Sequence, residues 1–205
     1  MMELNNRLLM EICSEISECP QKIEQFALAG KGNFLAYLQV FQSIQECEMQ
    51  NYSISVTLAD EYKSMIGPTW NHLLYMCGRF TRGLKFMHSF TMDERFRCGL
   101  MSNRYVRNID ATDFIYYELD KGIFTLIGSL PIRKITGDTN IFKAINDAEC
   151  KLDLETLAVS MVPHPGEILS FKNFSASEVQ LHDIWPGRFV NQIEAAHKMQ
   201  TLKVL

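Results

Sequence analysis

The chain has 205 residues, of which 47% are hydrophobic and 21% are charged, and these values are ordinary for a globular protein. Its formal net charge of −4 argues against a protein that coats nucleic acid, because phosphate binding requires a positive excess. The sequence lacks a run of about 18 apolar residues, so a membrane span is not expected.

The first part of the chain has mainly helical patterns. Apolar residues recur at helical spacing, and Pro20, Asn33 and Thr69 are good residues for helix starts. Helices are therefore expected over residues 4–16, 20–28, 34–48, 70–77 and 81–90. The stretch 52–66 fits two interpretations, because its apolar residues alternate like a strand and also repeat like a helix.

A hairpin is expected over residues 113–130. Two runs rich in β-branched and aromatic residues flank Asp120, Lys121 and Gly122, and a short loop with glycine suits a hairpin. Residues 95–107 are expected to form strand and loop beside it.

The C-terminal part of the chain alternates between helical and extended patterns. A long helix is expected to start at Asp138 or Thr139 and to end before Pro163. Residues 167–174 are expected to form a strand, the stretch up to Trp185 a short helix, and residues 201–205 an extended segment. No internal repeat is apparent.

These elements predict an α+β fold with a small, mainly antiparallel sheet centred on 113–130 and covered by several helices. The expected organisation is one domain, 1–205, with a helical part over 1–91 and the sheet with its covering helices over 92–205.

Five stretches carry a family resemblance. They are an early helix (Leu35 to Phe41), a helix pair (Gly67 to Phe90), paired strands (113–130), a strand with a short helix (Phe171 to Trp185) and a closing strand (Glu194 to Val204). Together they resemble the N-terminal effector domain of AraC/XylS-type transcriptional regulators, in the subgroup with a mixed helical and sheet domain. The resemblance implies ligand sensing and dimerisation. The family's helix-turn-helix DNA-binding domain is not among the stretches that carry the resemblance.

The segment from Arg79 to Arg107 contains seven basic residues and only two acidic ones, Asp93 and Glu94. Guanidinium groups bind carboxylates and phosphates bidentately, so one interpretation is an anion site. The other is a solvated surface that pairs with acids elsewhere. Aromatic residues with polar groups can line a ligand pocket. The candidate ligand-binding residues are Trp70, His72, Tyr75, Arg79, His88, Arg95, Arg97 and Tyr116.

Cysteine and histidine patterns predict neither metal binding nor catalysis. The six cysteines form no CxxC pair, the five histidines are scattered, and no Gly-x-Ser-x-Gly motif occurs. The thiols are expected to be reduced and mostly buried in a cytoplasmic protein, because the N-terminus does not resemble a signal peptide. No metal, cofactor or catalytic residue is expected.

The sequence thus favours a non-catalytic domain that senses a small molecule, with an organic anion as the candidate ligand, and dimerises for a transcriptional regulator. Direct nucleic-acid contact and membrane association are not expected. The alternatives are a stand-alone cytoplasmic binding or interaction protein and, third, a small enzyme.

Overall fold

The computed structural model describes residues 20–50, 53–59, 63–66, 71–87, 92–113, 121–159, 173–182 and 201–204. Within them, nine strands form one sheet in the order β3-β2-β1-β4-β5-β6-β7-β8-β9. The strands are β1 (Ile44–Met49), β2 (Ile54–Leu58), β3 (Lys63–Ile66), β4 (Gly83–Phe86), β5 (Asn108–Ala111), β6 (Lys134–Gly137), β7 (Leu152–Val159), β8 (Phe174–Leu181) and β9 (Thr201–Val204).

Most of the sheet is parallel. Only β1–β2 and β2–β3 pair antiparallel, whereas every pairing from β1–β4 to β8–β9 is parallel. The presence of helices together with a sheet is confirmed. The prediction of a small, mainly antiparallel sheet is wrong in its size and in the sense of its pairing.

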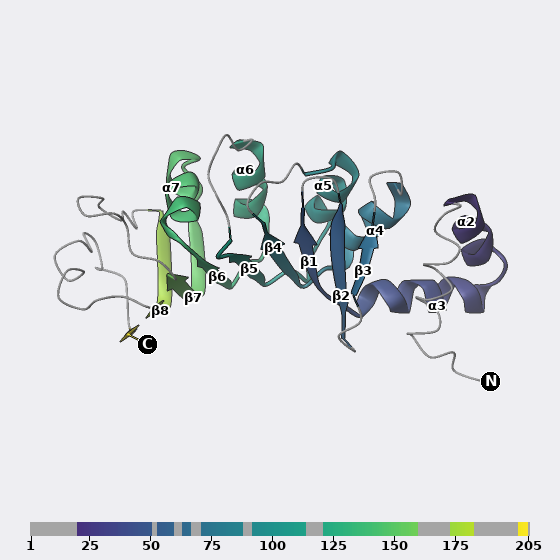
Figure 1. Ribbon diagram of the computed structural model, residues 1–205, viewed down its shortest axis with the longest axis horizontal. Coiled ribbons are helices and arrows are strands. Elements are labelled where there is room, and N and C mark those ends of the chain that lie inside the picture. Colours follow the sequence, from purple (N-terminus) through teal and green to yellow (C-terminus); the bar gives the residue numbers. More distant parts are fainter. Residues whose placement is uncertain are drawn as a thin grey trace.

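Helices connect successive strands from β3 to β7 and lie on one side of the sheet (Figure 1). They are α4 (Asn71–Phe80), α5 (Glu94–Met101), α6 (Lys121–Ser129) and α7 (Thr139–Asp147), while α2 (Pro20–Leu28) and α3 (Lys31–Gln42) precede β1. From β4 onward, the strands stand in the sheet in the same order as in the chain. The chain therefore builds the sheet by repeating one strand-and-crossover unit.

The sequence of each unit carries the same pattern, which is buried–x–x–buried–x–buried. It occurs as Thr81, Leu84 and Phe86; as Val106, Ile109 and Ala111; as Ile132, Ile135 and Gly137; and as Leu154, Leu157 and Val159. Ladder partners Gly83, Asn108, Lys134, Thr156, Glu178 and Thr201 are 22 to 26 residues apart in sequence. The expectation that the chain has no internal repeat is therefore wrong. The units vary in length, and alanine or glycine fills some of the buried positions.

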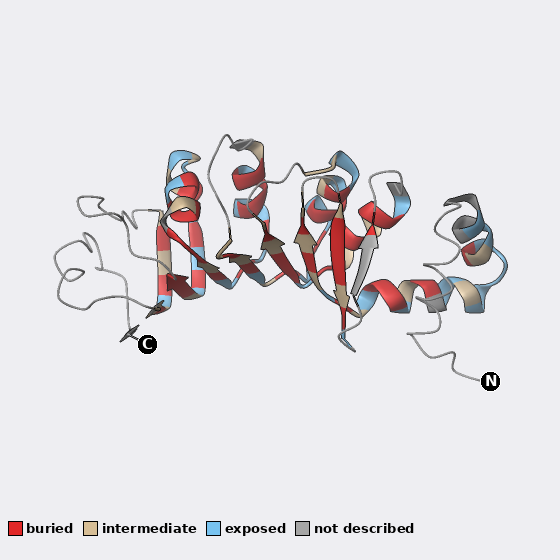
Figure 2. Ribbon diagram, viewed as in Figure 1, coloured by how far each residue is buried: buried red, intermediate tan, exposed pale blue. Residues whose placement is uncertain are grey.

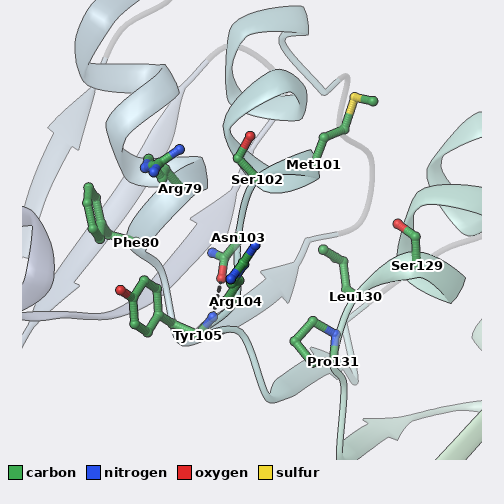
Figure 3. Close-up of a pocket in the computed structure, with 10 residues that line it drawn as sticks. All are labelled: Arg79, Phe80, Met101, Ser102, Asn103, Arg104, Tyr105, Ser129, Leu130 and Pro131. Atoms are coloured by element: carbon green, nitrogen blue, oxygen red, sulfur yellow. Dashed lines mark hydrogen bonds between the residues drawn. The ribbon is translucent and has the colours of Figure 1, made fainter.

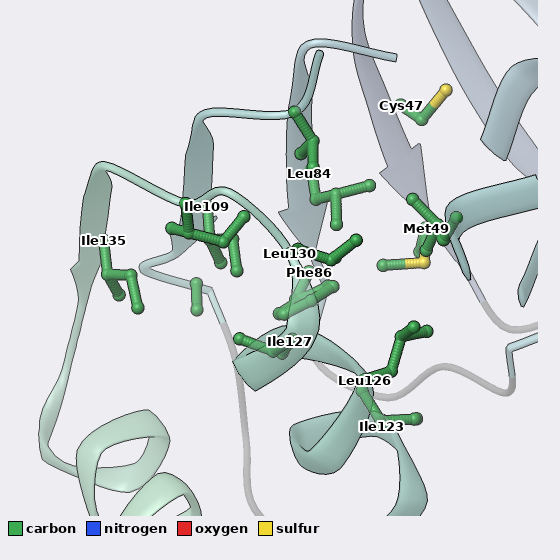
Figure 4. Packing of buried hydrophobic residues seen from close by; sticks show 14 of the residues in the cluster. Cys47, Met49, Leu84, Phe86, Ile109, Ile123, Leu126, Ile127, Leu130 and Ile135 are labelled. Atoms are coloured by element: carbon green, nitrogen blue, oxygen red, sulfur yellow. The ribbon is translucent and has the colours of Figure 1, made fainter. Parts of the chain in front are cut away.

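The core lies between the sheet and its helices. Leu84, Ile109 and Ile135 are aligned on adjacent strands and are almost completely buried. Figure 4 shows these side chains on the same side as Ile123 and Ile127 of α6. Burial of each such side chain contributes roughly 1.5–3 kcal/mol, so the aligned rows hold successive units together. Figure 2 shows the buried residues on the strands and on the sheet-facing sides of the helices.

The expected hairpin is not formed, because its second half is helix α6. Ile123, Phe124, Leu126, Ile127 and Leu130 are all buried, and their spacing places them on the helix face that covers the sheet. Burial of this face overrides the strand propensity of its β-branched residues. The first half of the expected hairpin, 114–120, lies outside the described residues.

The expected long helix from 139 ends early, at residue 147, and a strand follows it. Glu149 has a φ of 53°, and the N–H of Cys150 donates to Ile145 O at 3.1 Å. The N–H of Glu149 donates to Asn146 O at 3.0 Å. This bonding pattern is a Schellman motif, which ends the helix and redirects the chain into β7.

Other elements also differ from their predicted type. Residues 83–86 and most of β8 are strands where helices were expected, 94–101 is a helix where strand and loop were expected, and the segment 1–91 holds four strands besides its helices. The stretch 52–66 contains strands β2 and β3, which resolves its two interpretations. The predicted helices near 20–28 and 70–77 and the extended segment near the C-terminus are confirmed.

Candidate functional site

The candidate site lies where α4, α5 and α6 end and β4, β5 and β6 begin. Each helix returns the chain across the sheet, so its last residue lies a few positions before the next strand starts. Phe80 ends α4, Met101 ends α5 and Ser129 ends α6. These ends and the short loops after them form one edge of the repeat array.

Basic residues gather at this edge, which we call the basic edge. They are Arg79, Arg82, Arg104, Arg107, Arg133 and Lys134. Three of them occupy the equivalent position in successive units, because the N–H of Arg107 donates to Arg82 O at 2.8 Å and the N–H of Arg133 to Arg107 O at 2.7 Å. The carboxylate of Glu155 pairs with Arg133 at 2.7 Å. The edge is thus a local positive region in a chain of net charge −4.

A pocket with a volume of about 880 Å³ opens at the same edge (Figure 3). This volume lies within the range of roughly 300–1,000 Å³ that is typical of small-molecule sites. The lining residues are Arg79, Phe80, Met101, Ser102, Asn103, Arg104, Tyr105, Ser129, Leu130 and Pro131. Polar and cationic groups therefore share the pocket with aromatic and aliphatic surface.

An aromatic pair and a guanidinium form one wall of the pocket. The rings of Phe80 and Tyr105 are stacked, with centroids 5.9 Å apart and an interplanar angle of 25°. The guanidinium carbon of Arg79 lies 5.8 Å from the Phe80 ring centroid, and its Nη1 donates to the Tyr75 hydroxyl at 3.4 Å. Both contacts restrict the orientation of Arg79, and the half-exposed Tyr105 ring adds aromatic surface to the wall.

Asn103 fixes the loop that carries Arg104 and Tyr105. Its side chain is buried and donates to Gly78 O at 2.7 Å and to Thr81 O at 2.9 Å. Its amide oxygen accepts from the backbone N–H groups of Tyr105 at 2.6 Å and Val106 at 2.9 Å. One side chain therefore bonds the end of α4 to the start of the next unit, which holds the pocket wall in place.

The structure brings together only some of the predicted ligand-binding residues. Arg79 lines the pocket, and Tyr75 contacts it through the hydroxyl group. His72 is exposed in the first turn of α4, and Arg95 and Arg97 lie in the first turn of α5, away from the helix ends that line the pocket. Trp70, His88 and Tyr116 lie outside the described residues.

Sequence reasoning missed Phe80, Tyr105 and Arg133 as site residues, and it placed Arg104 only in the basic run. The available signal was the repeat itself, because Arg82, Arg107 and Arg133 all follow the first buried residue of a unit.

The second feature of interest is the side of the sheet opposite α4–α7, which we call the open face. Its side chains alternate with the buried rows, and across β4–β8 they include Lys85, Asn108, Asp110, Lys134, Thr136, Thr156, Glu178 and Gln180, with the buried Ala158 between Thr136 and Gln180. Asn108 and Lys134 are exposed. Figure 1 shows no described helix on this side of β4–β8. The open face is therefore a polar surface that spans successive units.

Charge on the open face changes sign along the strands. The basic edge lies where the strands begin, whereas Lys85 farther along β4 forms ion pairs with Glu48 at 3.9 Å and Asp113 at 3.5 Å. Asp110 adds another carboxylate beside Lys85 in the ladder. The two ends of these strands thus offer surfaces of opposite charge.

The described cysteines are free thiols. Cys47, Cys77 and Cys150 are buried, and Cys98 is exposed. Burial, together with a hydrogen bond to Cys47, raises the pKa of the Cys77 thiol well above its ordinary value, and burial also raises the pKa of Cys150. The Cys77 and Cys150 thiols therefore stay protonated and act as small hydrophobic groups.

Across the described segments, histidine, cysteine and carboxylate side chains do not form a group of three that could hold a metal ion. In the same segments, every helix is too short or too polar to cross a bilayer.

Comparison with known proteins gives no relatives: the chain matches no family model, no curated protein and no solved structure.

Proposed function

We propose that this chain is a non-catalytic interaction module that binds a protein partner across the open face, with an acidic segment of the partner on the basic edge. The observation that carries the proposal is the stacking of consecutive units in chain order, with helices on one side and a polar sheet surface on the other.

The architecture supports a role in binding. Units of 20–29 residues, each with a strand and a crossover, are typical of leucine-rich repeats, and such solenoids present long continuous surfaces to their partners. The spacing of 22 to 26 residues between ladder partners falls in that range. Because each unit adds one strand, the open face displays rows of side chains that no single helix or loop provides.

The charge at the basic edge supports an acidic partner. Arg82 is exposed, and no carboxylate among the described residues forms an ion pair with it. Arg82 lies beside Arg107 at the basic edge. Among the described residues, the carboxylate of Glu155 forms its ion pair with Arg133 and not with Arg82. Arginine forks bind carboxylates through two parallel hydrogen bonds, so an acidic segment along this edge would be oriented as well as attracted.

Site-specific photo-crosslinking tests which surface meets the partner. A crosslinking residue is placed at Asn108 or Lys134 on the open face, and at the exposed Lys143 of α7 as the control. The expected result is one partner that is crosslinked from both open-face positions and not from position 143. Equal crosslinking from position 143 would contradict the proposal.

Binding measurements with the purified partner then test the charge. Arg82→Glu and Lys143→Glu change the net charge equally, and both side chains are exposed. We expect Arg82→Glu to weaken binding by about tenfold or more, because a repulsive contact replaces a bidentate pair. Lys143→Glu should have little effect at physiological salt. Equal losses for both variants would show that only overall charge matters and would exclude the basic edge as the contact.

A further inference from the structure

We infer that the pocket at the ends of α4, α5 and α6 is a binding site for a small organic anion that carries a planar ring. Arg79 and Arg104 belong both to the pocket and to the basic edge, but the inference does not depend on the protein partner proposed above, because it rests on the cationic and aromatic lining of the pocket.

The cationic groups of the pocket favour an anion. Arg79 and Arg104 both line it, and among the described residues neither forms an ion pair with a carboxylate. Arg79 is half-buried and, among the described residues, makes one side-chain hydrogen bond, to the Tyr75 hydroxyl at 3.4 Å, which leaves most of its five N–H donors for other acceptors. A carboxylate or phosphate oxygen satisfies such donors best.

The C-terminal carbonyl groups of the helices at the pocket compete only weakly with a ligand for these arginine side chains. The C-terminal carbonyls of a helix carry partial negative charge, which favours a nearby cation and opposes an anion. Here several of these carbonyls already accept hydrogen bonds. Asn103 donates to Gly78 O, the Thr81 N–H donates to Cys77 O at 3.0 Å, and the Ser129 hydroxyl donates to Leu126 O at 2.6 Å. These carbonyl groups at the ends of α4 and α6 thus already have hydrogen-bond partners before a ligand arrives.

The aromatic wall favours a ring. Tyr105 is 50% exposed although it is stacked on Phe80, so part of its ring is available to a ligand. Met101 is 68% exposed and also lines the pocket, where Leu130 and Pro131 add further apolar surface. A planar group that stacks on Tyr105 would bury aromatic surface at little entropic cost, because the Phe80 ring and the Asn103 hydrogen bonds already hold Tyr105.

The two features together set the class of ligand. An inorganic anion would satisfy the arginines and leave the aromatic wall in water, whereas a neutral ring would do the reverse. A ring that carries a phosphate or carboxylate contacts both parts of the wall. Phenyl phosphate is the simplest probe with both groups, inorganic phosphate has only the charge, and phenol has only the ring.

The experiment is calorimetric titration of the full chain with these three probes. We expect phenyl phosphate to bind at least tenfold more tightly than inorganic phosphate, and phenol to show no measurable binding. Arg104→Ala should weaken phenyl phosphate binding about tenfold, which is the usual effect of losing a charge-assisted hydrogen bond. Tyr105→Ala should reduce the affinity for phenyl phosphate to that for inorganic phosphate.

Arg95→Ala is the matched control, because Arg95 is exposed in the first turn of α5 and its loss changes the net charge equally. It should leave all three titrations unchanged. Arg79→Lys keeps the charge and removes the planar fork, so it tests Arg79 if Arg79→Ala does not fold. The inference is overturned if phenyl phosphate binds no better than inorganic phosphate, or if Arg95→Ala weakens binding as much as Arg104→Ala.

Discussion

Gly78 of α4 and Gly99 of α5 allow the two helices behind the pocket to touch backbone to backbone. A Cβ atom at Gly78 would lie 2.2 Å from Phe96 O, and one at Gly99 would lie 2.1 Å from Tyr75 O. Neither position has room for a side chain, and the opposing atoms belong to the helix backbones. This contact sets the spacing of α4 and α5, and therefore of the pocket residues at their ends.

Gly99→Ala is expected to destabilise the fold by at least about 1–3 kcal/mol, because the helices must separate to admit the methyl group. Gly32→Ala is the control, since a Cβ at Gly32 in α3 meets nothing within 4 Å. That substitution should raise stability by roughly 0.5–1 kcal/mol through better helix propensity. Urea unfolding measures both. Equal stability of the two variants would contradict the close contact.

Asn103→Ala is expected to cost at least about 2–3 kcal/mol, because it leaves two carbonyls and two N–H groups without the partners that the Asn103 side chain gives them. Asn108→Ala removes the same side chain from an exposed position on β5 and should stay within about 0.5 kcal/mol of the wild type. Thermal unfolding of both variants gives the comparison. If Asn103→Ala unfolds at the wild-type temperature, these bonds contribute no net stability.

The stability of Asp138→Asn relative to the wild type should change with pH. Burial raises the pKa of Asp138 in the folded state, although hydrogen bonds from Asn140 and Ile141 act to lower it. The folded state therefore binds the proton more tightly than the unfolded state does. The contribution of this group is most favourable below its unfolded pKa near 3.8 and declines as pH rises through the folded pKa.

Asparagine keeps the cap on α7 without the buried charge, so the stability of Asp138→Asn minus that of the wild type should rise between acidic and neutral pH. Urea unfolding at a series of pH values measures this difference. Asp138→Ala serves as the second variant, and it should be about 1 kcal/mol less stable than Asp138→Asn because it lacks the cap. A pH-independent difference for Asp138→Asn would show that the carboxyl titrates alike in both states.

Glu149→Gly is expected to stabilise the protein by about 0.5–1 kcal/mol. The φ of 53° at Glu149 is unfavourable for a residue with a Cβ, and glycine adopts this angle without a free-energy cost. This gain exceeds the free-energy cost of the extra freedom that glycine gives to the unfolded chain. Glu149→Ala removes the same charge and keeps the Cβ, so it should leave stability nearly unchanged. Denaturant midpoints test the pair. A glycine variant no more stable than the alanine variant would contradict the argument.

Local signals in the sequence identified several elements correctly. Pro20 starts α2, Asp138 caps α7 through a bond from the Asn140 N–H at 2.9 Å, and the C-terminal segment pairs as β9. Such features depend on residues close together in the chain, so a short stretch determines them. The concentration of arginines between Arg79 and Arg107 was likewise visible, and Arg79 lines the pocket.

The tertiary structure decided the type of two segments that are rich in apolar residues and fit more than one type. Residues 123–129 have strand propensity but form a helix, because their buried side chains cover the sheet, and 152–159 form a strand because β6 and β8 pair with them on both sides. Short apolar runs fit either state until a neighbouring unit supplies partners. The same reason explains the site, since Arg82, Arg107 and Arg133 are remote in sequence and become neighbours only when parallel pairing brings equivalent positions of successive units side by side.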